Sequence, residues 1–412
     1  MRALHELPTS LDETYERLLK EITTTNQHHA YRLLLCLTVA RRPLRVEELA
    51  ELLALDFDGT EAEIPELKEE WRWKDQQEAV LSTCPSLISI VDSGLHRVVH
   101  FSHFSVKEFL TSDRLASSAD VSHFRIFLEP AHNVIVKACL GILHRSDNEV
   151  GDSDAKNRSP LREYAARYWV DHVQFEKVSR TVEDGMRRLF DLAEPHFTSW
   201  LKTYDIDVGW DNYADNSKIP HGSPLYYASL CGFCDLAAYL ADVHPHLVNA
   251  RGGRNYNPMV AALHRRHLNT AELLYQRGAD VDIRGTCKRT PLHAASTEGS
   301  IDIAQWLLAR GADANSQDNN GDVPLHLAAK NGHFEFVRML LTFGVTVDSK
   351  NKDNRTSLHV ASEGRHAKIV RLLLEFGADV AAQDRIHRTP LHLALSWVSV
   401  NIALLYRITG LM

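Results

Sequence analysis

The stretch Thr290-Pro291-Leu292-His293-Ala294-Ala295 returns at a fixed interval along the C-terminal half of the chain. Its counterparts begin at Val323, Thr356 and Thr389, each 33 residues after the one before. Pro258 and Pro224 extend the series toward the N-terminus at nearly the same spacing. A constant period of this size indicates one supersecondary unit that is used repeatedly, since each copy buries its apolar face against its neighbour. We therefore expect about six copies within residues 216–412, the first and last of them atypical.

Each copy carries the signals of two helices. Thr290 is suited to cap a helix, and Pro291 to stand at its first position, where no backbone N–H is needed. Gly299, eight residues after that proline, predicts that this helix stops with a residue at positive φ. A second helix follows, and a glycine such as Gly377 ends it before a polar turn. Apolar residues at helical spacing predict a core between successive second helices, formed by Leu307, Leu340 and Leu373.

The pattern resembles the ankyrin repeat. The period, the Thr-Pro-Leu-His box, the first-helix glycine and the Gly-Ala-Asp turn agree together, which makes the match specific. The resemblance implies paired antiparallel helices with an outward hairpin in each repeat, stacked into a curved array that binds proteins. One box histidine per repeat is better explained as a bridge between backbone groups of adjacent loops than as a catalytic relay. The residues expected to hold the repeats together are Thr290, Pro291, His293, Gly299, Pro324, His326, Gly332, His359, Gly377, Pro390 and His392.

Some copies depart from this pattern. Tyr226 replaces the box histidine in the first copy, and Arg266 and Arg365 occupy the glycine position in the second and fifth. Either Arg365 is held at positive φ, or Gly364 takes the turn one residue early. Residues 397–412 are mostly apolar, although a terminal repeat should present a polar face. We expect self-association through this C-terminal repeat, unless further repeats follow it.

The whole chain has the composition of an ordinary globular protein. Of its 412 residues, 44% are hydrophobic and 24% are charged, with a formal net charge of −8. This balance argues against a general binder of nucleic acids or acidic membranes. No apolar run approaches the roughly 20 residues of a membrane helix, and the N-terminus lacks a secretory core. Six scattered cysteines are typical of reduced intracellular thiols, so the cytoplasm is the expected compartment and the nucleus the alternative.

Residues 1–120 are predicted to form a winged-helix domain. Amphipathic patterns predict helices that start at Leu11 and that cover residues 31–39 and 46–55. Residues 87–91 and 97–101 are predicted strands, joined by a turn at Asp92-Ser93-Gly94. Three helices followed by a two-stranded hairpin is the order of elements in a winged helix.

Residues 121–215 are predicted to form a helical connecting domain, with helices at 131–143 and after Ser159-Pro160. The polar stretch 211–222 is the best linker to the repeats. The sequence leaves open whether this connecting domain packs on the winged helix or on the first repeat. The fold class expected for the chain is therefore mainly α: a winged helix with a small β-hairpin, a helical connecting domain and a C-terminal ankyrin-repeat solenoid.

Several motifs of the N-terminal half resemble one known segment. They are Asp12-Glu13-Thr14-Tyr15, Arg42-Pro43-Leu44 and His100-Phe101-Ser102-His103-Phe104-Ser105. The segment is the winged helix that follows the NACHT nucleotide-binding domain in many fungal NACHT–ankyrin proteins, and it is also labelled after a GPI inositol-deacylase. The resemblance implies a domain that packs on a nucleotide domain and helps to hold an off state. The phosphate loop GxxxxGK[ST] of a NACHT domain is absent, so we expect the sequence to be a shortened form of a longer gene product.

No group of residues indicates catalysis, a metal site or a cofactor site. His100 and His103 are expected on different faces at the end of the hairpin, and neither a carboxylate nor a cysteine completes a metal site there. Cys231 and Cys234 have redox spacing but lie at a turn between two repeat helices, without the preceding strand of a redox motif. No nucleophile motif such as GxSxG is present. We expect a protein that is not an enzyme and takes no cofactor.

The favoured function is a protein-interaction scaffold, as the sensor or effector arm of a NACHT-type signalling protein. Its protein partner is expected on the concave face of the repeats, and neither nucleic acid nor a membrane is expected as a partner. Residues just before each box are predicted to face this groove, and they alternate in charge. The predicted partner-binding residues are Arg289, Asp322, Arg355 and Arg388.

The alternative function is a nucleic-acid-binding regulator that uses the winged helix. Phosphate contacts dominate affinity for DNA, so its third helix should be basic. Glu47, Glu48 and Glu51 instead make the polar face of the helix at 46–55 acidic, which argues against this alternative.

Overall fold

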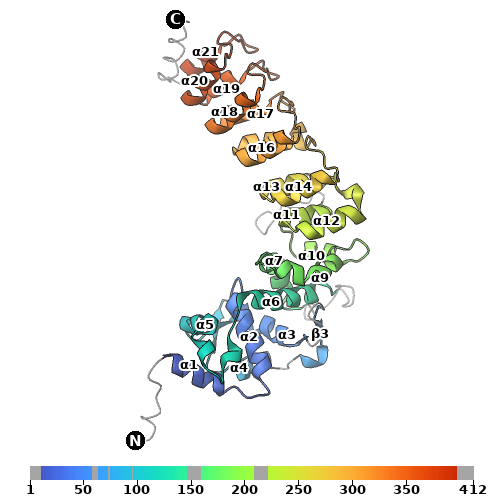
Figure 1. Cartoon of the computed structure of the whole chain (residues 1–412), viewed down its shortest axis with the longest axis vertical. Coiled ribbons are helices and arrows are strands. Elements are labelled where there is room, and N and C mark those ends of the chain that lie inside the picture. Colours follow the sequence, from blue (N-terminus) through green and yellow to red (C-terminus); the bar gives the residue numbers. More distant parts are fainter. Residues whose placement is uncertain are drawn as a thin grey trace. The chain divides into compact units, whose positions relative to one another are not determined.

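The computed structural model describes residues 11–57, 64–72, 75–94, 96–145, 159–207 and 221–396. The chain divides into two units, Met1–Asn216 and Ser217–Met412. Both are mainly helical, as predicted, and Figure 1 labels their elements. Within the described ranges, no helix combines the length and the apolar character needed to cross a membrane.

The first unit contains the predicted β-hairpin within a three-stranded antiparallel sheet of order β1–β5–β4. Ser93 lies opposite His96, so the hairpin turn includes Gly94, whose φ is +61°. The predicted hairpin is confirmed. The elements of this region are α1 (Leu11–Lys20), α2 (Gln27–Val39), β1 (Leu44–Arg45), α3 (Val46–Leu53), β2 (Leu55–Asp56), β3 (Glu66–Leu67), η2 (Glu69–Trp71), α4 (Gln76–Thr83), β4 (Ile88–Ser93), β5 (His96–Phe101) and α5 (Phe104–Thr111).

The structure contains elements that the sequence patterns did not predict, among them β1 and α4. β1 pairs with the hairpin strand β5, and α4 is the helix that directly precedes the hairpin. Helical periodicity did not reveal α4 because its eight residues bury only Ala79, Val80 and Thr83. The predicted helix 46–55 is also shorter than expected, since Leu55 pairs with Leu67 in the small sheet of β2 and β3.

The acidic residues of α3 are not arranged as the sequence suggested. Glu48 is completely buried and accepts hydrogen bonds from the Arg42 guanidinium at 2.7 and 2.5 Å and from the backbone N–H of Arg45 at 2.7 Å. Glu51 is also buried, and it accepts from Arg72 at 2.7 Å and from the N–H of Leu161 at 2.8 Å. The expected solvent-facing acidic surface is therefore wrong for these two residues, because both carboxylates are buried and pair with arginines and backbone N–H groups inside the first unit.

The connecting helices pack on the winged-helix region, which answers the question that the sequence left open. α6 packs against α2 and α7. The indole N–H of Trp200 donates to the carbonyl of Ala166 at 2.9 Å, and its ring meets that of Trp169 edge-on at 5.4 Å. The remaining elements are η3 (Leu115–Ser117), η4 (Ser122–Phe124), α6 (Leu128–Leu143), α7 (Arg162–Val173), α8 (Val178–Thr181), α9 (Glu183–Leu189) and α10 (His196–Thr203).

Two neutral histidines lie in the core of the first unit. His172 and His132 are buried, with their Nδ1 atoms 2.8 Å apart, and the Tyr164 hydroxyl lies 2.9 Å from His172 Nε2. One Nδ1 donates its proton and the other accepts it, so the hydrogen bond is lost when both rings are protonated. Burial lowers the pKa of His132 to about 4 and that of His172 to about 3, from an ordinary 6.5.

Acidification is expected to destabilise the first unit. The unfolded chain binds a proton on each histidine below pH about 6.5 while the folded unit stays neutral, so stability is complete above that pH and falls as the pH drops toward 4. We expect a loss on the order of 4 kcal/mol in the free energy of unfolding between pH 7 and pH 5, about 2 kcal/mol from each histidine. Urea denaturation at both pH values measures it.

The variant His172→Phe removes one of the two titrating groups and should flatten this pH dependence, whatever its effect on stability at pH 7. His100→Gln, at an exposed histidine of β5, is the matched control and should leave the slope unchanged. An equal slope in all three proteins would show that the buried histidines do not control the pH response.

The second unit is a series of helix pairs in which a first helix starts at each box proline or serine (Figure 1). The proline stands at the first helical position as predicted, and the backbone N–H of the residue before it donates to Nδ1 of the box histidine. The helices are α11 (Pro224–Cys231), α12 (Cys234–Val243), α13 (Pro258–His264), α14 (Leu268–Gln276), α15 (Pro291–Glu298), α16 (Ile301–Ala309), α17 (Pro324–Asn331), α18 (Phe334–Phe343), α19 (Ser357–Glu363), α20 (Ala367–Glu375) and α21 (Pro390–Ser396), with the short turns η8 (Pro245–Leu247) and η9 (Thr286–Lys288).

The predicted core and turn positions of the repeats are confirmed. Leu307, Leu340 and Leu373 are completely buried in α16, α18 and α20. Arg365 has φ +61°, whereas Gly364 has φ −73°, so the arginine itself adopts the left-handed conformation. Residues 397–412, on which the expectation of self-association depends, lie outside the described residues.

Candidate functional site

The loops that precede α17, α19 and α21 are each built around one buried or half-buried Asp or Asn side chain. Asp318 Oδ1 accepts from the N–H groups of Asn320 and Asp322 at 2.7 and 3.0 Å. The equivalent Asn351 and Asp384, at successive steps of 33 residues, make the same pair of bonds in their own loops. Such side chains fold a short loop by replacing backbone hydrogen bonds, which sets the position of the residues just before the next box.

The box histidines link each repeat to the next. His293 Nδ1 accepts from the N–H of Thr290 at 3.1 Å, so Nε2 carries the proton and donates to the carbonyl of Asp322 at 3.0 Å. His326 and His359 donate in the same way to the carbonyls of Arg355 and Arg388, at 2.9 and 3.1 Å. Burial lowers the pKa of all three rings, which keeps them neutral and able to both accept and donate.

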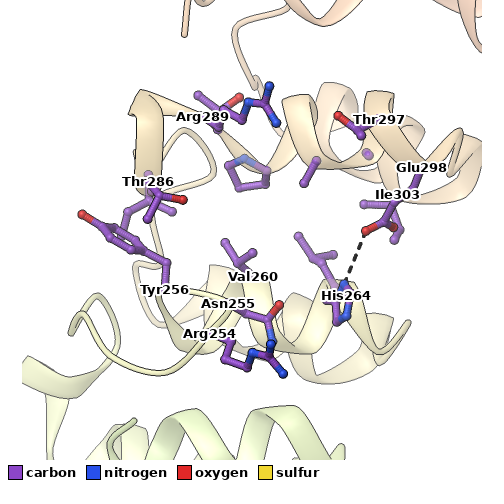
Figure 2. A pocket seen from close by; sticks show the side chains of 17 residues that line it. Arg254, Asn255, Tyr256, Val260, His264, Thr286, Arg289, Thr297, Glu298 and Ile303 are labelled. Atoms are coloured by element: carbon purple, nitrogen blue, oxygen red, sulfur yellow. Dashed lines mark ion pairs between the residues drawn. The ribbon is translucent and has the colours of Figure 1, made fainter. Parts of the chain in front are cut away.

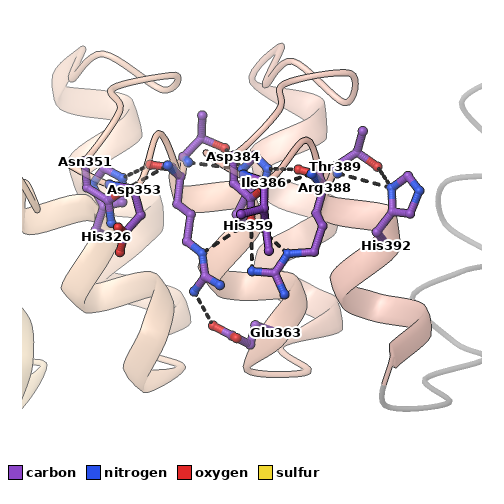
Figure 3. Close-up of polar contacts among 12 residues, drawn as sticks. His326, Asn351, Asp353, His359, Glu363, Asp384, Ile386, Arg388, Thr389 and His392 are labelled. Atoms are coloured by element: carbon purple, nitrogen blue, oxygen red, sulfur yellow. Dashed lines mark hydrogen bonds and ion pairs between the residues drawn. The ribbon is translucent and has the colours of Figure 1, made fainter.

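The four predicted partner-binding residues lie at equivalent positions at the ends of these loops, and Figure 3 shows the last of them, Arg388, beside Asp384. Each of the first three reaches the loop of the following repeat, at a residue 29 positions further along the chain. Arg289 Nε donates to Asp318 Oδ2 at 3.2 Å, Asp322 accepts from Asn351 Nδ2 at 2.7 Å, and Arg355 Nε lies 3.8 Å from Asp384.

Internal pairing therefore explains the alternating charge at these positions. Arg355 also donates to Glu363 at 3.0 Å, and Arg388 Nε and Nη2 bind Asp384 at 3.0 and 2.9 Å (Figure 3). The side chain of Arg289 keeps 42% of its surface exposed and that of Arg388 keeps 38%, against 21% for Arg355. All three arginines can present N–H groups to a partner, but they do so from positions that also support the array.

A second set of histidines explains which residues occupy the glycine position at the end of each first helix. A Cβ atom added to Gly299 or Gly332 would lie 2.7 or 2.6 Å from the ring of His333 or His366 in the next repeat. These rings donate to the carbonyls of Thr297 and Lys330 at 2.9 and 3.0 Å. Glycine is therefore required at these positions for two reasons: the backbone has positive φ, and the neighbouring histidine ring leaves no space for a Cβ atom.

The sequence exceptions follow the same rule. Arg266 and Arg365 replace this glycine, with φ +62° and +61°. The residue 34 positions after each of them is Ser300 or Ser399, where the other repeats have His333 and His366. In the sequence, a larger residue replaces glycine at the two steps where serine replaces histidine.

The winged-helix region does not present a basic surface helix. α3 is buried on nearly all sides. α4 follows α3, packs against it as the second helix of the pair, and contains no lysine or arginine. Nucleic-acid readers place that second helix in the major groove, supported by phosphate contacts. The argument against nucleic-acid binding therefore rests on the burial of α3 and the composition of α4, not on an exposed acidic face.

The cysteines and histidines with the spacing of redox or metal motifs lie in separate elements. Cys231 ends α11 and is buried, Cys234 begins α12, and both are free thiols. His100 lies in β5, and His103 caps α5 by accepting from the N–H of Ser105 at 3.3 Å. Among the described residues, no group of three or more His, Cys, Asp or Glu side chains is arranged to hold a metal ion.

Two protein families match parts of the chain. A profile described as ankyrin repeats (3 copies) matches residues 225–318, 259–351, 292–384 and 325–406 in overlapping sets. A profile described as the winged helix domain of GPI inositol-deacylase matches residues 15–122. Ankyrin repeats and winged-helix domains are generally non-catalytic.

Curated relatives share these regions. Azaphilone pigments biosynthesis cluster protein L from Monascus ruber is 33% identical over 296 residues, which are 68% of this chain and 61% of that protein. Alpha-latrocrustotoxin-Lt1a from Latrodectus tredecimguttatus is 35% identical over 75 residues, which are 18% of this chain and 5% of the toxin. The chain thus spans about three fifths of the length of the fungal relative. It combines a winged-helix domain of the GPI inositol-deacylase type with a C-terminal array of ankyrin repeats.

Proposed function

We propose that the chain is a non-enzymatic scaffold that binds a protein partner on the concave face of its ankyrin array. The observation that supports this most directly is the row of equivalent residues before the boxes. The first three are held in place by the next loop, and Arg388 by Asp384 of its own loop. Arg289, Arg355 and Arg388 have fixed backbones and partly exposed guanidinium groups. Preorganised charges of this kind favour rapid and specific association.

The proposal extends to the context in which the scaffold works. The winged-helix match and the fungal relative are consistent with the sensor or effector arm of a NACHT-type signalling protein, whose nucleotide domain would be supplied outside this sequence. The connecting helices pack on the winged-helix region, so the described parts of the first unit form one packed body on which such a domain can dock. Self-association through residues 397–412 stays a prediction from their apolar sequence.

Neutralising the four charged side chains that precede the boxes tests the proposal. Because charge reversal would place like charges against Asp384 or Asp318, the informative variant is Arg289→Gln, Asp322→Asn, Arg355→Gln and Arg388→Gln combined. A partner is captured by the full chain from an extract of the source organism and its binding kinetics are measured. We expect association at least about tenfold slower and less dependent on salt, with little change in dissociation.

Glu335→Gln combined with Arg338→Gln is the control, since both residues are exposed and pair with each other on the second helix α18. It should bind as the unchanged chain does. Equal association rates for the unchanged and the fourfold-neutralised chains would remove the row from the binding surface. Failure of the full chain to retain any partner would contradict the scaffold itself.

A further inference from the structure

The first helices of most neighbouring repeats pack closely on one another, but α13 and α15 are in looser contact. α11 contacts α13, α15 contacts α17, and α17 contacts α19. Between α13 and α15 lies a pocket of about 340 Å³, shown in Figure 2. It is bounded by these two helices and by the loops that precede them. The pocket therefore marks a step at which the regular packing of the array is interrupted.

The missing histidine link explains part of this opening. In the first repeat, Tyr226 stands at the box position, and its hydroxyl accepts from the N–H of Asn255 at 3.1 Å. Later repeats use His293, His326 and His359 for the equivalent link. The second repeat has Val260 at this position, and an aliphatic side chain forms no hydrogen bond. Val260 lines the pocket, as does Arg289, the residue 29 positions later that the link would have reached.

A small residue on the opposite helix explains the rest. Ala294 of α15 lines the pocket and is exposed. The equivalent residues of the next two repeats are Leu327 and Val360, and both are buried. Alanine removes the branched side chain that fills this position elsewhere in the array, so an apolar surface stays uncovered.

One buried polar group is also left without its usual neighbour. Asn257 caps α13, and its Oδ1 accepts from the N–H of Val260 at 2.8 Å. The side chain is completely buried, and within the described part of the chain its Nδ2 has no hydrogen-bond partner. The corresponding Thr290 of the third repeat faces His293 Nδ1 at 2.8 Å. Because valine stands where the later repeats have histidine, the Nδ2 group of Asn257 lacks this neighbour, and a buried polar group without a hydrogen bond is unusual.

The chemistry of the pocket is apolar in the middle and basic on both walls. Val260, Leu263 and Ile303 supply aliphatic surface. Arg254 and Arg289 lie on opposite walls, and the His264–Glu298 pair, 3.4 Å apart, lies at one end (Figure 2). Residues 251–290 contain eight Lys or Arg and three Asp or Glu, in a chain whose net charge is −8. Two of these basic residues, Arg254 and Arg289, line the pocket and attract an anionic ligand, and the apolar centre adds a preference for a hydrophobic group.

We propose that the pocket docks an extended acidic segment of the protein partner, which inserts one large apolar side chain between α13 and α15. Carboxylates next to that side chain pair with Arg254 and Arg289. The inference rests on the proposed scaffold function and deepens it, since it states what the partner presents. A partner side chain of leucine or phenylalanine size covers the aliphatic surface that Leu327 and Val360 cover in the other repeats.

Three fluorescein-labelled octapeptides test the proposal against the full chain by fluorescence polarisation. The first has a central leucine between aspartates and glutamates, the second has serine in place of the leucine, and the third has lysines in place of the acids. We expect the first to bind at least about tenfold more tightly than the other two, which corresponds to about 1.4 kcal/mol. Ala294→Leu should weaken its binding by a similar factor, because it fills the pocket with the residue found in the next repeat.

Ala309→Leu is the matched control, since Ala309 is an exposed alanine on the second helix of the same repeat and outside the pocket. This variant should bind the leucine peptide as the unchanged chain does, and Arg254→Gln should bind it more weakly. Equal affinity of Ala294→Leu, or no measurable binding of the leucine peptide, would overturn the pocket assignment. A single-stranded DNA oligomer that competes as well as the peptide would also overturn it, by showing attraction to any polyanion.

These outcomes are separate from the test of the scaffold. Arg289 belongs to both surfaces, but the peptide assay is decided by Ala294→Leu and Arg254→Gln, which change no residue of the row, whereas the partner kinetics use the fourfold variant and a captured protein. Loss of peptide binding with intact partner binding would reject the pocket and keep the scaffold.

Discussion

Replacing Leu340 with alanine is expected to lower the free energy of unfolding of the repeat array by about 2–5 kcal/mol, the range for a buried leucine. Leu340 is completely buried in α18, and α18 packs against both α16 and α20. The truncated side chain leaves a cavity between three second helices that cannot all move inward together. Urea denaturation of the full chain measures the loss, and hydrogen exchange of α18 assigns it to the array.

The control for this prediction lies in the same helix. Phe343 is 57% exposed, so Phe343→Ala removes an even larger side chain with little loss of burial. We expect a change of no more than about 0.5 kcal/mol, as for other surface substitutions. Similar effects of the two substitutions would mean that the helix does not present Leu340 to its neighbours as the structure shows.

Gly332→Ala is expected to destabilise the array by about 2–3 kcal/mol, through two separate effects. Gly332 has φ +78°, and an L side chain in this conformation costs about 1–2 kcal/mol. The added Cβ would also lie 2.6 Å from the ring of His366, which donates to the carbonyl of Lys330. Moving the ring away breaks that bond, at about 0.5–1.5 kcal/mol. Urea denaturation again provides the measurement.

Two further variants separate these effects. Gly344 also has positive φ, +91°, but a Cβ there meets nothing within 4 Å, so Gly344→Ala should show the conformational cost alone. Adding His366→Ser to Gly332→Ala recreates the combination found naturally at Arg365 and Ser399. In this background, Gly332→Ala should lower the free energy of unfolding by only about 1–2 kcal/mol relative to His366→Ser alone. A cost that stays unchanged in the serine background would exclude the contact between glycine and histidine.

The repeat architecture could be predicted from sequence because its determinants are local. The proline, glycine and leucine positions recur every 33 residues, and each acts within its own helix or turn. Arg365 was ambiguous because either it or Gly364 could take the left-handed conformation. The structure places Arg365 at positive φ, and the residue 34 positions later in the sequence is Ser399 instead of a histidine.

The winged-helix region was predicted less completely because its elements are short and depend on distant partners. β1 has two residues and exists through its pairing with β5, more than 50 positions away. Glu48 and Glu51 have the sequence signature of an exposed helical face, but arginines and backbone N–H groups from other elements bury them. Helical periodicity in the sequence does not reveal these contacts with other elements.

The sequence by itself determined the period, the helix pairs and the residues that repeat in them, since these depend on interactions within about four residues. Tertiary structure decided what the repeating charges do. Arg289, Asp322 and Arg355 each meet a side chain 29 positions later, so charges that look free in the sequence are shared between neighbouring repeats. It also decided where the array opens: Val260 and Ala294 are unremarkable alone, but they face each other across one step between repeats, and only stacking brings them together.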